Sequence, residues 1–230
     1  MVRDRTAAAL IAEAIGTFLF VFVGAGSVVL GDYLASNGGS GPGLVGVALA
    51  HGLALAVLVS ALGPVSGGHF NPAVTLAVWI MGKIRPTLAG GYVFAQLVGA
   101  LLAGLALRAL FSQAVWRPSA IGTPALGTGI SPLAGIAIEA VLTALLVLAV
   151  IGTAVDSRAP KIGGLAIGLA VAADILVGGP LTGGAMNPAR WFGPAMAAGA
   201  YANWYVWWIG ALIGAAVAAL IYRSALAEAR

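Results

Sequence analysis

The sequence has no cysteine and little charge, and each shortage narrows the class of protein. Without cysteine, neither a disulfide nor a thiolate metal site can form, and the redox compartment stays undetermined. Only 8% of the 230 residues are charged, whereas 61% are hydrophobic and the mean hydropathy is +1.04. Soluble proteins carry roughly 25% charged residues. The composition therefore predicts an integral membrane protein.

The chain also has no basic patch, although its net charge is +4. Its eleven Lys and Arg residues are spread in ones and twos, which argues against nucleic-acid binding. Six spans leave only Arg108 and Arg117 on one side of the membrane. The cations on the other side are Arg3, Arg5, Lys83, Arg85, Arg158, Lys161, Arg223 and Arg230. The positive-inside rule therefore predicts that both termini are cytoplasmic.

Six apolar segments are long enough to cross a bilayer, whose hydrocarbon core requires about 20 helical residues. Connections that contain glycine or proline separate these segments. We expect spans over roughly 7–30, 43–62, 89–110, 132–154, 162–179 and 203–223. The pattern predicts an all-α membrane protein that forms one domain over residues 1–230.

A polar stretch of the second half contains Asn187-Pro188-Ala189 and then Arg190. Asn is a favoured N-cap and proline suits the first helical position, so a helix should begin at Pro188. The first half contains the same motif, Asn71-Pro72-Ala73, 116 positions earlier. The apolar run that follows it, 74–81, reaches about half of a 30 Å hydrocarbon core. Two re-entrant half-helices that meet end to end would form a seventh, split span along a polar path.

The two halves also align outside these motifs and in the same order. The aligned pairs are Glu13-Ala14-Ile15-Gly16-Thr17 with Glu139-Ala140-Val141-Leu142-Thr143, and Gln96-Leu97-Val98-Gly99-Ala100 with Trp207-Trp208-Ile209-Gly210-Ala211. Because each half has three spans, the second half enters the membrane from the opposite side, which gives an inverted repeat. We divide the chain into repeat 1 at about 7–110, a linking loop at about 111–131 and repeat 2 at about 132–223.

The paired motifs and the repeat resemble the aquaporin, or major intrinsic protein, family over nearly the whole chain, from Glu13 to Trp208. The resemblance implies a passive channel for water and small neutral solutes, with one pore in each subunit of a homotetramer. It also implies that Asn71 and Asn187 donate hydrogen bonds at the centre of the pore. Half-helix dipoles that point at this centre are a recognised barrier to protons and cations.

Carried over residue by residue, the same resemblance gives the walls of a selectivity constriction as His51, Ile175, Gly184 and Arg190. This set resembles that of a plant tonoplast subgroup associated with water and ammonia, so we expect ammonia to pass and consider urea. The segment 179–183 looks more like glycerol channels, which keeps a glycerol-type facilitator as an alternative. We expect one ring nitrogen of His51 to stay free for a solute and to gain charge at lower pH.

Glu13 and Glu139 are carboxylates within predicted spans, which by default indicates proton or ion coupling. Their matching positions in the two halves favour a scaffold in which each accepts hydrogen bonds from its own re-entrant loop. His69 and Gln96 are assigned to the same scaffold, with gating as the alternative role of His69. Asp174 has no counterpart in the first half. Asp174 either bonds a loop N–H near the outer mouth or faces the vestibule, and the sequence leaves both alternatives open.

The leading interpretation is a passive channel that excludes protons and ions. A secondary transporter is the main rival, because inverted repeats and broken helices also build transporters, and a closed structural membrane protein is the third class. We expect no enzyme, because no nucleophile, base and orienter are brought together, and no cofactor or metal. The expected partners are water, small neutral solutes, lipid and further copies of the chain, in the cell (inner or plasma) membrane.

Overall fold

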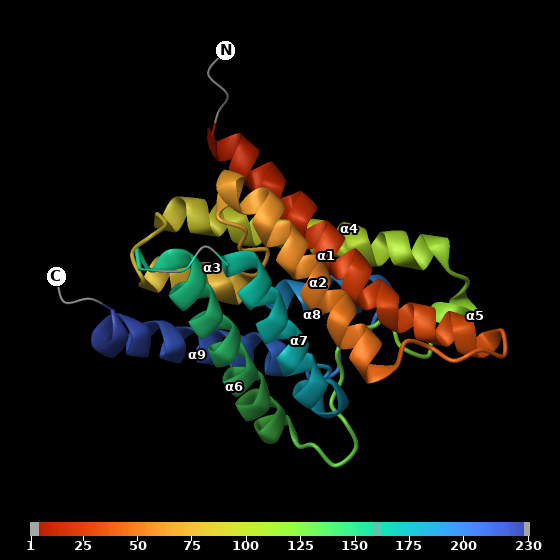
Figure 1. Ribbon diagram of the computed structural model, residues 1–230. Coiled ribbons are helices and arrows are strands. Elements are labelled where there is room, and N and C mark those ends of the chain that lie inside the picture. Colours follow the sequence, from red (N-terminus) through yellow and green to blue (C-terminus); the bar gives the residue numbers. More distant parts are fainter. Residues whose placement is uncertain (1–4, 159, 161, 228–230) are drawn as a thin grey trace.

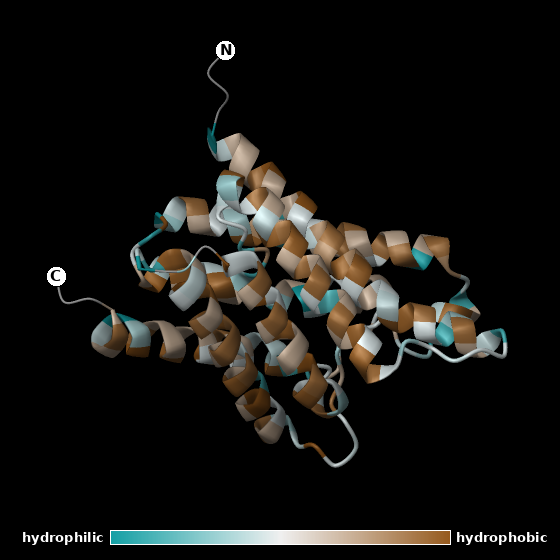
Figure 2. Ribbon diagram, in the orientation of Figure 1, coloured by the Kyte–Doolittle hydropathy of each residue, from teal (hydrophilic) through white to brown (hydrophobic). Residues whose placement is uncertain are grey.

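The computed structural model describes residues 5–158, 160 and 162–227, and over these residues it contains helices and no strands (Figure 1). Hydrophobic residues recur along every long helix, as the colouring of Figure 2 shows. The helices that are long and apolar enough to cross a bilayer are α1 (Arg5–Ser36), α2 (Gly43–Ser66), α4 (Pro86–Leu110), α6 (Pro132–Val150), α7 (Gly163–Thr182) and α9 (Tyr205–Ile221), where α6 and α9 are counted with the π-helical turns that continue them to Val155 and Leu226. The predicted number of spans is confirmed.

Two short helices complete the predicted architecture. They are α3 (Pro72–Ile80) and α8 (Pro188–Ala198), and each begins at the proline of its Asn-Pro-Ala motif. The remaining elements are α5 (Gln113–Trp116) in the linking loop and two π-helical turns, η1 (Ile151–Val155) and η2 (Tyr222–Leu226), which continue α6 and α9. Neither short helix is long enough to cross a membrane alone, which is the expected property of a half-helix.

The helix ends differ from the prediction in one informative way. The expected second and fifth spans end near residues 62 and 179, yet α2 and α7 continue through Pro64 and Pro180. A proline removes one backbone hydrogen bond, and in the last turn of these helices that loss does not end the helix. The helices end instead at Gly67 (φ 91°) and Gly183 (φ 81°), which take the left-handed conformation that glycine adopts without strain.

The packing repeats between the halves. Helix α1 packs against α4 as α6 packs against α9, while α2 of the first half crosses α7 of the second. At that crossing, a Cβ atom on Gly52 would lie 2.6 Å from the carbonyl oxygen of Gly168, so both positions require glycine for close helix contact. The half-helices are exchanged, because α3 packs against α9 and α8 against α4. This exchange brings the two Asn-Pro-Ala motifs together.

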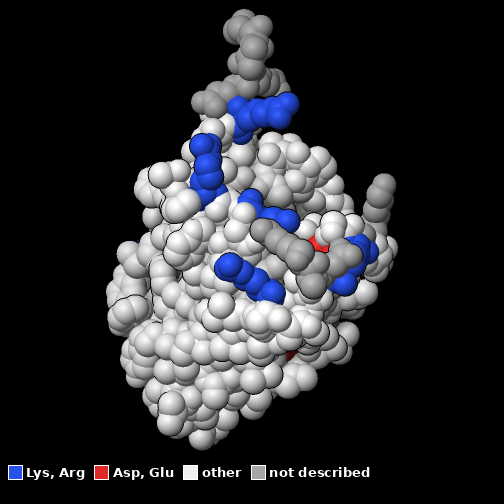
Figure 3. Space-filling view, turned by 90° about the vertical axis from the view of Figure 1, so that its left-hand side faces the viewer, with Lys and Arg blue, Asp and Glu red and all other residues white. Residues whose placement is uncertain are grey.

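The start of α1, the end of η2 and the connections α3–α4 and α6–α7 lie on one side of the molecule, at the left of Figure 1. Figure 3 shows this face, over which Lys and Arg side chains are spread. Among the predicted cytoplasmic cations, Arg3, Lys161 and Arg230 lie outside the described residues. The described part of the set, with Arg108 and Arg117 at the other side, fits the charge asymmetry expected of a membrane protein.

An ion pair ties the α6–α7 connection to the end of the chain. Arg158 bonds Asp156 at 2.6 Å, and its Nη2 also donates to the carbonyl of Leu226 at 2.9 Å. The hydroxyl of Tyr222 donates to Asp156 at 2.9 Å. Hydrogen bonds from Arg158 and Tyr222 hold the pKa of Asp156 below its usual range, so this carboxylate stays ionised at neutral pH.

Candidate functional site

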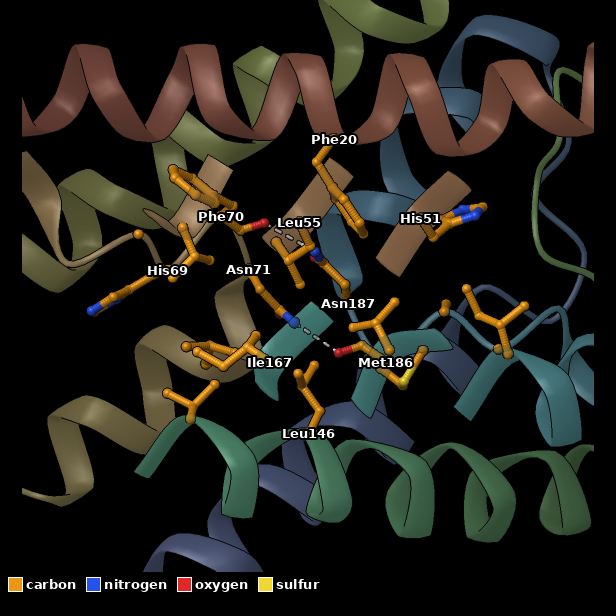
Figure 4. A pocket seen from close by; sticks show the side chains of 18 residues that line it. Phe20, His51, Leu55, His69, Phe70, Asn71, Leu146, Ile167, Met186 and Asn187 are labelled. Atoms are coloured by element: carbon orange, nitrogen blue, oxygen red, sulfur yellow. Dashed lines mark hydrogen bonds between the residues drawn. The ribbon is translucent and has the colours of Figure 1, made fainter. Parts of the chain in front are cut away.

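The two asparagines of the repeated motif join the re-entrant loops at the centre of the molecule. Asn71 accepts a hydrogen bond from the Ala73 N–H at 2.8 Å, and its Nδ2 donates to the carbonyl of Met186 at 2.9 Å. Asn187 caps α8 in the same way, and its Nδ2 donates to the carbonyl of Phe70 at 2.9 Å. Figure 4 shows these reciprocal bonds side by side. Each amide nitrogen keeps a second N–H that these two bonds do not use.

Glu13 holds the first re-entrant loop from α1. One carboxylate oxygen accepts from the Ser66 hydroxyl at 2.7 Å and the His69 N–H at 3.0 Å. The other oxygen accepts from the Phe70 N–H at 2.7 Å and the Gln96 side chain at 2.8 Å. With four donors and no exposed surface, this carboxylate is fully engaged in holding the loop.

Glu139 holds the second loop from α6 in the same arrangement. It accepts from the Thr182 hydroxyl at 2.6 Å and from the N–H groups of Ala185 at 3.0 Å and Met186 at 2.7 Å. Trp207 donates to the Thr182 carbonyl at 2.9 Å, which adds a second brace to this loop. Both glutamates are fully buried and hydrogen-bonded to their loops, a geometry that fits the predicted scaffold role.

Arg190, in the first turn of α8, is held by two partners. Its Nε donates to Nε2 of His51 at 2.9 Å, and its Nη1 donates to the carbonyl of Gly122 at 2.9 Å. The Nδ1 atom of His51 bonds the Val47 carbonyl at 2.8 Å. The prediction that His51 keeps a free ring nitrogen is therefore wrong. A protonated His51 has no lone pair with which to accept from Arg190, so this hydrogen bond favours the neutral ring.

The four predicted constriction residues lie together, between two cavities. His51 and Ile175 line both the inner and the outer cavity, Gly184 lines the inner one and Arg190 the outer one. Gly184 lies against Ile175, since a Cβ atom added to Gly184 would be 3.3 Å from the Ile175 Cα. One wall is thus apolar and another has no side chain, while Arg190 supplies the charge.

The two cavities differ in volume. The outer vestibule has a volume of about 420 Å³, whereas the inner cavity has about 20 Å³, close to the minimum of roughly 10–15 Å³ that one water needs. Apart from the asparagines, the side chains along the inner cavity are mainly apolar (Figure 4). His69 and His51 lie at opposite ends of it. The inner cavity therefore has room for little more than one water molecule at a time.

Three further polar residues have definite places. His69 bonds Thr75 through Nδ1 at 3.1 Å and packs edge-on against Tyr92, as a loop-packing residue does. Asp174 is 2% exposed and lines neither cavity, so it occupies neither of its two expected positions. Its Oδ2 and the Trp191 Nε1 have no hydrogen-bond partner in the described part of the chain.

Two glycines that sequence reasoning missed position the constriction. Gly24 on α1 lies directly under His51, so that a Cβ atom there would overlap the imidazole ring. Gly122, whose carbonyl holds Arg190, packs against the backbone of Ala25, 2.8 Å from where its own Cβ would be. Helix α1 therefore supports both groups that hold the arginine. Nothing in the sequence distinguishes these two positions among 34 glycines.

We expect Gly24→Ala to push the His51 ring into the pore and to lower water permeability several-fold. Gly26→Ala is the matched control, because a Cβ atom there meets only the end of the flexible Leu107 side chain, at 3.2 Å. Stopped-flow light scattering on proteoliposomes with equal protein content measures the effect. Equal permeability of Gly24→Ala and the unmodified protein would show that α1 does not position His51.

The fold and the site together define a membrane channel, in which two half-helices meet at the centre and a narrow path opens into an outer vestibule. Residues 2–222 match the family model described as Major intrinsic protein. The chain belongs to this family. It is a passive channel for water or small solutes in a membrane, and not an enzyme or an ion-coupled transporter.

Individual relatives agree with this assignment. The chain is 49% identical to Aquaporin TIP4-4 of Zea mays over 217 residues, which is 93% of this chain and 84% of that protein. It is 48% identical to Probable aquaporin TIP3-2 of Arabidopsis thaliana over 223 residues, covering 93% and 82%. The X-ray structure of the aquaglyceroporin from Plasmodium falciparum matches with a TM-score of 0.83 and 25% identity, covering 96% of this chain and 97% of the other.

Proposed function

We propose that the channel passes ammonia, and also urea, as well as water. The observation that carries this proposal is the composition of the constriction. Ile175 presents an apolar wall, Gly184 presents no side chain, and both ring nitrogens of His51 are engaged. Arg190 is then the main source of hydrogen-bond donors for a passing solute. Pore width and lining donors set selectivity, so a constriction with few polar groups favours a neutral solute that sheds water at low cost.

We also propose that Asn71 and Asn187 mark the point where protons and cations are excluded. Helices α3 and α8 both direct their N-termini at the bonded asparagine pair, so the positive ends of two helix dipoles meet there. The N–H groups of the asparagines can donate to a solute but cannot accept a proton from it. Together with the charge of Arg190, this arrangement supports a pore that conducts neutral molecules.

The organisation of the protein is part of the proposal. Residues 1–230 form one channel domain, with repeat 1 at about 7–110, the linking loop at about 111–131 and repeat 2 at about 132–223. Both termini are cytoplasmic, and the channel assembles as a homotetramer. Large apolar residues exposed on helices of both repeats support assembly in lipid, for example Val57 and Val141. The expected location is the plasma membrane, and the relatives do not support that location. Because the relatives belong to the tonoplast subgroup, they favour a vacuolar membrane for this protein.

The solute preference is tested by comparing water, ammonia, urea and glycerol in the same proteoliposomes. We expect ammonia flux clearly above that of protein-free vesicles, and we expect Ile175→His to lower ammonia flux more than water flux, because it adds a polar ring to the apolar wall. Ile175→Val, which keeps the wall apolar, is the control. Equal losses of both fluxes would make the protein a plain water channel, and glycerol flux above urea flux would favour the glycerol-type facilitator.

A further inference from the structure

A groove on the outside of the molecule lies away from the pore. Its volume is about 350 Å³, and its lining is mainly apolar, with Leu76 and Trp79 from α3, Val93 from α4, and Trp208 and Leu212 from α9. It exists because α3 is only nine residues long and packs against both α4 and α9, so that the short helix forms the floor between two long ones. Trp79 keeps 47% of its surface exposed there.

The groove faces the surroundings of the protein rather than its interior. Large apolar side chains on the helices that flank it are exposed, including Phe94 (71%) on α4 and Ile213 (47%) on α9. In a membrane-spanning chain, such surfaces contact hydrocarbon. Gly90 adds width, since a Cβ atom there would meet nothing within 4 Å. The shape suits a flexible apolar chain that runs along the helices.

Cations surround one end of the groove. Pro86 is part of its lining, and the connection that leads into Pro86 carries the exposed residues Lys83 and Arg85. Arg223 reaches the same end, because its Nη1 donates to the carbonyl of Ile80, the last residue of α3, at 2.9 Å. No acidic residue occurs between Asp32 and Glu139, so α3, α4 and the connection between them contribute no negative charge to this end of the groove. The carboxylate of Asp156, which accepts from Tyr222 next to Arg223, is paired with Arg158.

We propose that this groove is a binding site for one anionic phospholipid. An acyl chain occupies the apolar groove against Trp79 and Trp208, and the phosphate of the headgroup lies at Lys83 and Arg85. Basic pockets beside membrane helices on the cytoplasmic side are suited to lipid phosphates, and tryptophan is favoured at the membrane interface, where Trp79 stands near the end of α3. The charge at the mouth selects an anionic lipid over a zwitterionic one and over a second copy of this chain, whose corresponding face is also positive.

Tryptophan fluorescence in vesicles tests the site without reference to the transported solute. The protein is reconstituted in phosphatidylcholine that contains a small fraction of phosphatidylglycerol with brominated acyl chains, which quench indole groups on contact. One juxtamembrane cation raises the binding constant for an anionic lipid by roughly five-fold. We therefore expect brominated phosphatidylglycerol to quench at a mole fraction at least about five-fold lower than brominated phosphatidylcholine does. Trp79→Phe combined with Trp208→Phe should remove most of this difference, because both indole groups line the groove.

Variants separate the headgroup from the groove. Lys83→Gln combined with Arg85→Gln should equalise the two lipids, and Gly90→Leu, which fills the groove, should weaken quenching by both. Arg117→Gln, which removes a cation at the other side, and Gly63→Leu, whose Cβ also meets nothing within 4 Å, are the controls that should change neither. Retained water permeability shows that each variant is folded. Equal quenching by the two lipids in the unmodified protein, or an unchanged preference in the double variant, overturns the proposal.

Discussion

Replacing Arg190 with valine is expected to admit cations and larger neutral solutes while water continues to pass. The substitution removes the only cation of the constriction and the two bonds that span it, to His51 and to Gly122. A unit charge about 4 Å from another is worth about 4 kcal/mol at an effective dielectric constant of about 20. Because about 1.4 kcal/mol corresponds to a factor of ten, we expect cation permeability to rise by at least about a hundred-fold.

Arg190→Lys separates charge from geometry. Lysine keeps the positive charge but cannot bond His51 and the Gly122 carbonyl through one rigid fork. We therefore expect it to exclude cations nearly as well as arginine while it discriminates urea and glycerol less. Paired measurements of cation leak and solute flux in one proteoliposome preparation give both quantities. Unchanged selectivity of a correctly inserted Arg190→Val would place the arginine outside the selectivity filter.

Removing the Glu139 side chain is expected to prevent stable folding. Glu139→Ala leaves the Thr182 hydroxyl and the N–H groups of Ala185 and Met186 without their buried acceptor. Each unpaired buried donor costs about 1–3 kcal/mol, and globular proteins are stable by only about 5–15 kcal/mol. We expect a large fall in the thermal midpoint in detergent and a reduced yield of monodisperse protein.

The controls for this prediction lie on the same helix. Thr143→Val, one turn further along α6, removes a buried hydroxyl that has no hydrogen-bond partner among the described residues, so it should change stability little. Glu139→Gln keeps the shape of the side chain but places an amide group next to the loop donors. Its thermal midpoint should lie between those of Glu139→Ala and Thr143→Val. Normal stability of Glu139→Ala would show that the carboxylate does not hold the second loop.

The sequence predicts the architecture well because the determining signals are local. An asparagine followed by proline begins both half-helices, and glycines end α2 and α7 at matching positions of the two repeats. The span lengths follow from the thickness of the bilayer. The predicted ends of α2 and α7 are wrong near Pro64 and Pro180. The free-energy cost of a proline in a helix depends on the turn in which it stands and on the helices packed around it.

The geometry of the site is less accessible from sequence. The four constriction residues come from resemblance to a family, and the pairing of His51 with Arg190 depends on three-dimensional contacts that residue types do not encode. The carbonyl of Gly122 and the space over Gly24 are backbone properties, so they leave no pattern of side chains to read. Asp174 shows the same limit, since its burial follows from helix packing and not from its neighbours in the chain.

The central claim is that the pore conducts neutral molecules through a positive, donor-rich centre. Simultaneous measurement of water and proton flux tests it most directly, in proteoliposomes that contain a pH-sensitive dye and are exposed to an osmotic step together with a pH step. We expect fast water flow, with internal pH changing no faster than in protein-free vesicles. A proton flux that rises in proportion to the water flux of the unmodified protein would contradict the account.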